Sequence, residues 1–403
     1  MIAFKDIEAA RDCIADAVFY SDCRHSIALS EITGMQIFCK FDNAQRTGSF
    51  KERGARNALA QLPPDQKKRG VIAASAGNHA QALAYQGKLL GIPATVVMPE
   101  YAPLIKITNC QKLGANVVLH GKDFAEAKAH AHQLGAEKGL AYIDGYDDPA
   151  IIAGQGTMGI EIINQVRDVD AVIVPVGGGG LIAGVSLAVK TLRPQTKVIA
   201  VEAENVASFS AALNANKPTK IDLKPTLADG LAIPQVGANA FAIAREHVDQ
   251  TVTVTEEQIA IAILRLAELE KTVVEGAGAT PLAVVLSEKL PDLARKRIVL
   301  PLCGGNIDPN ILSRVIEHGL VADGRLCRFT AVISDRPGGL ASLSKLIAGA
   351  GASIKQIVHD RAFASSDVST VNVLCTIETR NHEHFALVRA RLKEHGVETY
   401  DAK

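Results

Sequence analysis

Short runs rich in Val and Ile alternate with longer Ala- and Leu-rich segments along most of this chain. Continuous apolar runs of this kind are typical of parallel strands that are buried on both faces, and the longer segments have the spacing of helices. The alternation predicts an α/β fold built on open, doubly wound sheets, which bind ligands at the carboxyl ends of their strands. The predicted strands are residues 71–74, 94–98, 116–119, 141–143, 171–176, 197–201 and 298–302, and the clearest helices are 80–90 and 124–138.

The pattern changes after about residue 320. Residues 321–327 form a predicted linker, and the tail that follows has the order strand, helix, strand, strand, helix, strand, which is that of a ferredoxin-like domain. We therefore expect a large domain at 1–320, with a smaller inserted subdomain at about 50–150, and a separate domain at 328–403. The tail elements are predicted at 328–334, 338–349, 353–360, 371–379, 385–392 and 398–401.

The composition excludes several classes of partner. The 403 residues include 43 basic and 43 acidic side chains, 4% aromatic residues and no Trp, so we expect no nucleic-acid or membrane surface. The uncharged stretch 171–189 contains Pro175 and five glycines, which disfavours a membrane helix. The start has no apolar signal region, and the seven cysteines form no CxxC pair. These features predict a cytoplasmic protein with reduced thiols that acts on small molecules.

A single lysine stands among small residues in the segment Thr47-Gly-Ser-Phe-Lys51-Glu-Arg-Gly54. An ordinary solvated lysine fits this spacing. The functional alternative is a lysine that is desolvated and held by a defined turn, because the neutral amine of such a lysine forms a Schiff base with an aldehyde cofactor.

The segment Ser75-Ala-Gly-Asn-His79 directly follows the predicted strand 71–74 and opens a helix. Free backbone N–H groups at a helix start, with small residues that allow close approach, suit a carboxylate or a phosphate. The simpler alternative is a tight turn between a strand and a helix.

Four consecutive glycines, Gly177 to Gly180, and then Leu181 follow the predicted strand 171–176. They leave four N–H groups unobstructed at a helix start, where the helix dipole also favours an anion. The spacing matches neither the dinucleotide fingerprint nor the nucleotide phosphate loop. We therefore expect a phosphate-binding loop of another class.

The last core strand ends in Pro301-Leu-Cys303-Gly-Gly-Asn306. A lone cysteine is more often a small buried hydrophobe. Cys303, however, stands at the carboxyl end of a strand and before two glycines, where sites form.

Together these four motifs resemble those of the fold-type II pyridoxal-phosphate enzymes (tryptophan synthase β-like fold), specifically the threonine and serine dehydratases, over residues 15–320. The tail resembles an ACT domain, a small amino-acid-binding module, and the whole layout resembles the medium-length threonine ammonia-lyases. The resemblance implies pyridoxal 5'-phosphate as cofactor, two open-sheet subdomains with a C-terminal ferredoxin-like domain, and a homodimer or homotetramer.

The resemblance also implies a role for individual residues. Lys51 would hold the cofactor and, once released, act as the base at the substrate Cα, while Phe50 would pack against the cofactor ring. Asn78 would bind the ring hydroxyl, Cys303 would face the pyridine nitrogen, and Glu275 would lie near the ring. The phosphate would be bound by Gly177, Gly178, Gly179, Gly180 and Leu181. The substrate carboxylate would be bound by Ser75, Ala76, Gly77, Asn78 and His79.

The implied reaction is a β-elimination that converts L-threonine to 2-oxobutanoate and ammonia, and L-serine to pyruvate. A neutral thiol at Cys303 would not force a proton onto the pyridine nitrogen, which favours elimination over transamination. The sequence does not separate a role in isoleucine biosynthesis from threonine catabolism. The alternatives are a serine racemase, a 3-hydroxyaspartate dehydratase, and a non-catalytic amino-acid sensor, which would require the loss of Lys51 or of the glycines.

Two differences from related enzymes help to distinguish this chain from them. The serine racemases have a second base, a serine, where this chain has Ala76, and cysteine synthases typically have Ser-Gly-Asn-Thr-Gly in this loop. Metal-dependent racemases carry an acidic residue six positions after a strand-end glutamate, whereas Glu202 is followed there by Ser208. One carboxylate with a hydroxyl suits K⁺ or Na⁺ better than Mg²⁺ or Ca²⁺. The alternative is that Glu202 is a surface residue.

In the tail, Ser334-Asp-Arg-Pro-Gly-Gly339 links the first predicted strand to its helix. In ACT domains this loop binds an amino acid, and its exposed N–H groups suit a carboxylate. We expect isoleucine or valine to bind at Asp335, Pro337, Gly338 and Gly339 and to change activity. The alternative is a tail that only promotes oligomerisation.

Overall fold

The computed structural model describes residues 2–360 and 369–401 of the chain. It divides into two compact units, Met1–Asp308 and Pro309–Lys403. This division precedes the predicted boundary at residue 320, because helix α14 (Pro309–Ala322) groups with the second unit. The predicted linker at 321–327 instead covers the end of α14, a turn, and the beginning of strand β11 at Leu326.

The large sheet of the first unit has six strands in the order β1-β2-β10-β7-β8-β9. All neighbouring strands are parallel except β1 and β2, which are antiparallel at one edge. Three of its strands were predicted within two residues at each end, but β1, β2 and β9 were not, because their polar residues interrupt the apolar run. The strands are β1 (Cys23–Ser26), β2 (Gln36–Lys40), β7 (Ala171–Pro175), β8 (Lys197–Ala203), β9 (Gln250–Val254) and β10 (Arg297–Pro301).

A second, fully parallel sheet forms between β2 and β7 in the sequence, with the order β5-β4-β3-β6. It lies within the predicted subdomain at about 50–150 and confirms the expectation of two open sheets. Three of its strands have the predicted bounds. The strands are β3 (Val71–Ala74), β4 (Ala94–Met98), β5 (Asn116–Leu119) and β6 (Ala141–Tyr142).

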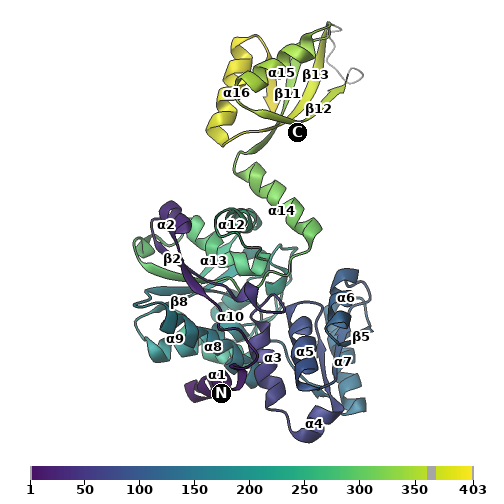
Figure 1. Cartoon of the computed structure of the whole chain (residues 1–403), viewed down its shortest axis with the longest axis vertical. Coiled ribbons are helices and arrows are strands. Elements are labelled where there is room, and N and C mark those ends of the chain that lie inside the picture. The colour runs from purple at the N-terminus through teal and green to yellow at the C-terminus, as the bar shows by residue number, and fades with distance from the viewer. Residues whose placement is uncertain (1, 361–368, 402–403) are drawn as a thin grey trace. The chain divides into compact units, whose positions relative to one another are not determined.

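Helices cover both sheets of this unit (Figure 1). They are α1 (Phe4–Ile14), α2 (Ile27–Thr33), α3 (Lys51–Ala60), α4 (Pro64–Arg69), α5 (Asn78–Leu90), α6 (Leu104–Lys112), α7 (Phe124–Lys138), α8 (Pro149–Gln165), α9 (Gly180–Leu192), α10 (Ser208–Ala215), α11 (Ala238–His247), α12 (Glu256–Leu269) and α13 (Gly276–Leu286). Three of them, α3, α5 and α9, begin within the predicted motifs. Each chemical motif of the sequence is therefore at the start of a helix or the end of a strand.

Two glycines allow α8 and α9 to pack closely. A Cβ atom at Gly184 of α9 would lie 2.6 Å from the backbone nitrogen of Gly156 in α8. A Cβ atom at Gly156 would lie 2.9 Å from the carbonyl oxygen of Gly184. Since α9 begins at the glycine loop and α8 follows residues 144–148, this contact fixes the distance between the two segments.

After α14, the second unit forms a domain that consists of an antiparallel sheet, in the order β12-β13-β11-β14, and the helices α15 and α16. Its element order is βαββαβ, as the sequence predicted, and its core includes Phe329, Ile347, Val373 and Leu392. The elements are β11 (Leu326–Ser334), α15 (Gly339–Gly349), β12 (Ser353–Asp360), β13 (Thr370–Glu378), α16 (His382–Glu394) and β14 (Glu398–Asp401). Within the described residues, we find no helix long and apolar enough to span a membrane.

The close contact between α8 and α9 can be tested by Gly184→Ala. The added methyl group has no space, and we expect the free energy of unfolding to fall by about 1–3 kcal/mol, as for other overpacked cores. Urea unfolding followed by circular dichroism measures this change. Leu192→Ala, at the exposed end of the same helix, is the control and should change it little. An unchanged Gly184→Ala midpoint would contradict the close packing.

Candidate active site

The four glycines form the turn between β7 and α9. Gly179 has a φ of +94° and stands immediately before the helix, a conformation that favours glycine. Within residues 2–360 and 369–401, no acceptor receives a hydrogen bond from the N–H groups of residues 177–180. Four backbone donors at a helix start, all without a protein partner, fit a phosphate group.

The glycines are also needed for packing. A Cβ atom at Gly178 would overlap the ring of Tyr146, and one at Gly180 would overlap the Tyr146 carbonyl oxygen. A Cβ atom at Gly177 would lie 2.9 Å from the Cα of Leu231. The glycines therefore serve two purposes, of which the sequence predicted only the exposure of the N–H groups.

The loop Ser75 to His79 opens α5 in a similar way. The Gly77 N–H donates to Ser75 Oγ at 3.2 Å, and a Cβ atom at Gly77 would meet nothing within 4 Å. The N–H groups of Ala76, Asn78 and His79 have no acceptor in the described part of the chain. This loop therefore offers a second set of free donors beside open space, as a carboxylate requires.

His79 is buried beneath this loop. Its Nε2 lies 3.1 Å from the carbonyl oxygen of Ile143, to which it donates. Burial, and after it the charge of Lys51, lowers the pKa of His79 to about 4. The imidazole is therefore neutral at pH 7 and adds no positive charge to the carboxylate loop.

Lys51 is the first residue of α3. Its Nζ donates to the carbonyl oxygen of Gly145 at 2.5 Å and lies 5.2 Å from the centre of the Phe50 ring. Burial lowers the pKa of this amine to about 8, although Asp144 and Glu275 oppose the shift. The solvated-lysine alternative is wrong, because Lys51 is desolvated and held by a specific bond.

A chain of amide and carboxyl side chains lies behind the substrate loop. Asn306 Nδ2 donates to the Thr47 carbonyl oxygen at 2.6 Å and to Asn78 Oδ1 at 2.8 Å. Asn78 Nδ2 in turn donates to Glu275 Oε1 at 2.7 Å. Burial, and after it Asp229, raises the pKa of Glu275 to about 7. The chain fixes the orientation of Asn78 and joins three of the predicted motifs, and the sequence analysis gave Asn306 no role in it.

Cys303 lies at the junction of β10 and the lysine loop. Its carbonyl oxygen accepts from the Phe50 N–H at 2.9 Å, and Ser49 pairs with Gly304 in an isolated antiparallel bridge. The thiol donates to the Pro301 carbonyl oxygen at 3.2 Å. Burial raises the pKa of Cys303 well above its usual range, so this wall of the site carries a neutral thiol.

The sequence analysis missed the segment 144–148, which connects these groups. Asp144 Oδ1 accepts from the N–H groups of Tyr146 and Asp147, at 3.0 and 2.9 Å. Asp147 caps α11, accepting from the N–H of Ala240 at 2.9 Å, and Asp148 caps α8. Gly145 binds Lys51, and Tyr146 contacts the glycine loop. The Asp148-Pro149 pair at a helix start was a legible signal, but it indicates only a cap.

Glu202 is fully buried, so the surface alternative is wrong. Its carboxylate accepts from the N–H groups of Phe209 and Ser210, at 2.7 and 2.9 Å, and burial raises its pKa. The buried Ser208 Oγ has no partner in the described part of the chain. Glu202 therefore caps α10, and the predicted cation at Glu202 and Ser208 stays a prediction. Among the described residues, no group of three or more His, Cys, Asp or Glu could hold a metal.

The low pKa of Lys51 can be measured in the cofactor-free protein. At a pKa of about 8, roughly a tenth of the amine is neutral at pH 7, against about one in 2,500 for an ordinary lysine. Since only the neutral amine reacts, trace labelling of Lys51 by acetic anhydride should rise with pH and level off above 8. In denatured protein, the same peptide should gain label up to about pH 10. Coincident native and denatured profiles would contradict the shift.

Comparison with known proteins agrees with this geometry. The family described as "Pyridoxal-phosphate dependent enzyme" matches residues 14–304. A relative from Thermotoga maritima, named L-threonine ammonia-lyase, is 43% identical over 398 residues, which cover 99% of each chain. A catabolic L-threonine dehydratase of Staphylococcus aureus is 42% identical over 327 residues, covering 80% of this chain and 94% of its own.

Solved structures are similar to about three quarters of the chain. Threonine deaminase isoform 2 of Solanum lycopersicum has a TM-score of 0.75 and 39% identity, covering 78% of this chain and 91% of its own. A serine racemase of Dictyostelium discoideum has a TM-score of 0.72 and 34% identity, covering 76% and 99%. The family match spans both sheets, the first three motifs and the fourth as far as Gly304, and the site has a desolvated lysine and a loop that fits a phosphate. The chain belongs to the pyridoxal-phosphate dependent enzymes.

Proposed function

We propose that this protein is a threonine ammonia-lyase, which converts L-threonine to 2-oxobutanoate and ammonia and also acts on L-serine. The observation that carries the proposal is the segment 144–148, which joins a lysine amine with a lowered pKa to a loop of free N–H donors. The relatives that cover this chain almost completely are named for the same reaction.

Pyridoxal phosphate supplies the electron-accepting ring on which this elimination depends. The chain supplies the positions of the reacting groups. The free N–H groups of residues 177–180 would bind its phosphate, and Phe50 and the neutral Cys303 thiol would contact its ring. The donors at Ala76, Asn78 and His79 bind the substrate carboxylate and so orient the substrate Cα.

Lys51 moves the proton. Its amine is neutral for a useful fraction of the time near pH 8, and a neutral amine can accept the Cα proton as a general base. The Gly145 carbonyl oxygen holds the lysine Nζ in place.

Serine racemase is the second candidate, because solved serine racemases have the same fold. Ala76 argues against it, since a methyl group cannot deliver a proton to the opposite face of the substrate. A 3-hydroxyaspartate dehydratase differs only in the substrate side chain. A sensor without activity would lack Lys51 or the glycines, and both are present.

For the second unit we propose an ACT domain that binds isoleucine or valine. Gly338 has a φ of +96° before α15, and a Cβ atom there would meet nothing within 4 Å. The helix start beside Asp335 and Pro337 is therefore open to a carboxylate, as at Gly77. The dehydratase that covers only 80% of this chain spans 94% of its own length, so a related enzyme does without such a tail. The homodimer or homotetramer, and the cytoplasmic location, stay predictions.

Lys51→Ala tests the lyase proposal. We expect purified wild type to release 2-oxobutanoate from L-threonine, and the variant to be slower by about 10⁴-fold, because base catalysis is lost. Release is followed by reduction of the oxo acid with a coupled dehydrogenase. Lys112→Ala, at an exposed site on α6, should retain wild-type turnover. Absence of wild-type turnover with both threonine and serine would overturn the proposal.

The same assay separates the alternatives. Chiral chromatography of the remaining serine detects racemisation, and substantial D-serine would favour the racemase. Turnover of 3-hydroxyaspartate in preference to threonine would favour the second dehydratase. Replacing K⁺ and Na⁺ by tetramethylammonium tests the cation at Glu202 and Ser208, and unchanged turnover and melting temperature would remove that proposal.

Isoleucine and valine test the regulatory proposal. Coupling between the two sites should change threonine turnover by about 5- to 150-fold at saturation. Gly338→Val would place a branched side chain at a positive φ and in the open space, so the response should disappear while basal turnover remains. Calorimetry measures binding directly. Flat turnover at millimolar concentrations of both amino acids, with no heat of binding, would remove the idea.

A further inference from the structure

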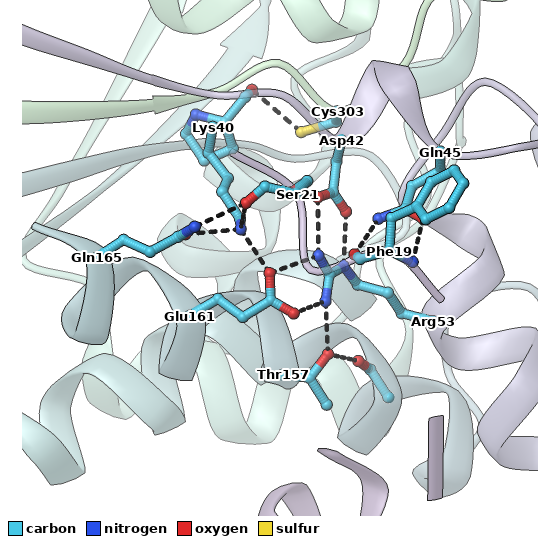
Figure 2. A network of polar contacts seen from close by, with 12 residues as sticks. Phe19, Ser21, Lys40, Asp42, Gln45, Arg53, Thr157, Glu161, Gln165 and Cys303 are labelled. Carbon is cyan, nitrogen blue, oxygen red and sulfur yellow. Dashed lines mark hydrogen bonds and ion pairs between the residues drawn. The ribbon is translucent and has the colours of Figure 1, made fainter. Parts of the chain in front are cut away.

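Four charged side chains form a buried cluster in the first unit (Figure 2). The cluster consists of Lys40 at the end of β2, Asp42 in the following turn, Arg53 in α3 and Glu161 in α8. Lys40, Asp42 and Arg53 are fully buried, and Glu161 is 6% exposed. Two positive and two negative charges are therefore enclosed in the core, and they balance.

Arg53 is bound through all five of its N–H groups. Its Nε and Nη2 donate to the two carboxylate oxygens of Asp42, at 2.6 and 2.8 Å. Its Nη1 and Nη2 donate to the two oxygens of Glu161, at 2.6 and 2.9 Å, and Nη1 also donates to Thr157 Oγ1 at 3.1 Å. Two bidentate pairs from one side chain are a geometry that only a guanidinium can make.

Lys40 completes the cluster from the other side. Its Nζ donates to Glu161 Oε2 at 2.5 Å, to Gln165 Oε1 at 2.8 Å and to the Ser21 carbonyl oxygen at 2.6 Å. Ser21 Oγ donates to Asp42 Oδ1 at 2.5 Å. Every charged group therefore has its partners, so that breaking one contact leaves another group buried and unpaired.

Stability alone does not account for such a cluster. Buried ion clusters are often no more stabilising than apolar side chains of the same volume, because removing charges from water is costly. Forked pairs do, however, fix the relative orientation of the segments that they join.

The three segments held by Arg53 are those that form the lysine site. Arg53 stands two residues after Lys51, in the first turn of α3. Asp42 precedes Asn43, whose N–H donates to the Leu302 carbonyl oxygen at 2.7 Å, immediately before Cys303. Glu161 belongs to α8, which begins directly after the segment that contains Gly145.

We propose that Arg53 is a positioning residue for the lyase reaction, which holds the first turn of α3 so that Lys51 reaches the Gly145 carbonyl oxygen. Its second effect is electrostatic, since its positive charge neutralises the carboxylate of Asp42, which acts on the Cys303 thiol. Burial, and after it the charge of Asp42, raises the pKa of the Cys303 thiol, so Asp42 acts on this wall. The inference rests on the proposed function for its kinetic readout, but not for the labelling readout below.

The first variant is Arg53→Lys, which keeps the charge balance and removes the bidentate pairs with Asp42 and Glu161. We expect kcat per bound cofactor to fall by about 10- to 100-fold, as for small displacements of a reacting group, with KM for threonine nearly unchanged. In the cofactor-free protein, the midpoint of Lys51 acetylation should rise above 8, because a displaced amine is less desolvated. A loss of stability alone would not move that midpoint.

Arg56→Lys is the matched control. Arg56 lies one turn further along α3 and pairs with the exposed carboxylate of Asp16 at 2.8 Å. Its replacement should leave kcat and the Lys51 midpoint unchanged. Glu161→Gln is the second cluster variant, for use if Arg53→Lys does not fold, and it keeps the shape of the side chain while removing one charge. Glu161→Gln should lower kcat and raise the Lys51 midpoint, as Arg53→Lys does.

The outcomes are separable. A raised Lys51 midpoint with a reduced kcat in either cluster variant supports the proposal. A folded variant with wild-type midpoint and wild-type kcat per bound cofactor overturns it and leaves the cluster a structural feature. If the wild type has no threonine turnover, the proposed function fails. A Lys51 midpoint that is higher in a cluster variant than in the wild type would still support the positioning of Lys51.

Discussion

The site depends on helix starts whose backbone N–H groups are left without a protein partner. The first N–H groups of any helix lack an intrahelical acceptor, and at several helices of this chain side chains accept from them. Asp123 caps α7, Asp148 caps α8, Asp147 accepts from the start of α11, and Thr255 caps α12. By contrast, α5 and α9 begin after Gly77 and Gly179 with no side-chain cap. These two starts lie at the carboxyl ends of β3 and β7, where free N–H groups fit an anion.

The same two helix starts require glycine for different physical reasons. At Gly77 a side chain would meet open space, and glycine leaves that space to a ligand. At Gly178 and Gly180 a side chain would collide with Tyr146, so these glycines are needed by the protein itself as well. The segment that carries Tyr146 also presents the Gly145 carbonyl oxygen to Lys51. One short segment therefore determines both the shape of the phosphate loop and the position of the reacting amine.

Local sequence patterns predicted what depends on local structure. The strands β3, β4 and β5 have the predicted bounds, because a parallel strand buried on both faces must be a continuous apolar run. The strands β1 and β9 lie at the edges of their sheet, where polar residues are tolerated, and they gave no such run. Lys51, the glycine loop and the Ser75 loop were found because each depends on consecutive residues. Asn306, Tyr146 and Arg53 were not, because each acts through partners that are remote in the sequence, such as Arg53 with Glu161.

The lowered pKa of Lys51 shows why these remote partners matter. A lysine in water is almost entirely protonated at neutral pH, and desolvation lowers the pKa so that its amine becomes available as a base. Desolvation would also expel a charged amine from the core unless other contacts held it, and Asp144 and Glu275 attract that charge only partly against burial. The chain must therefore fix the backbone of the lysine more firmly than the side chain alone requires. An exposed helix could not do this, whereas a helix whose first turn is held by two forked ion pairs can.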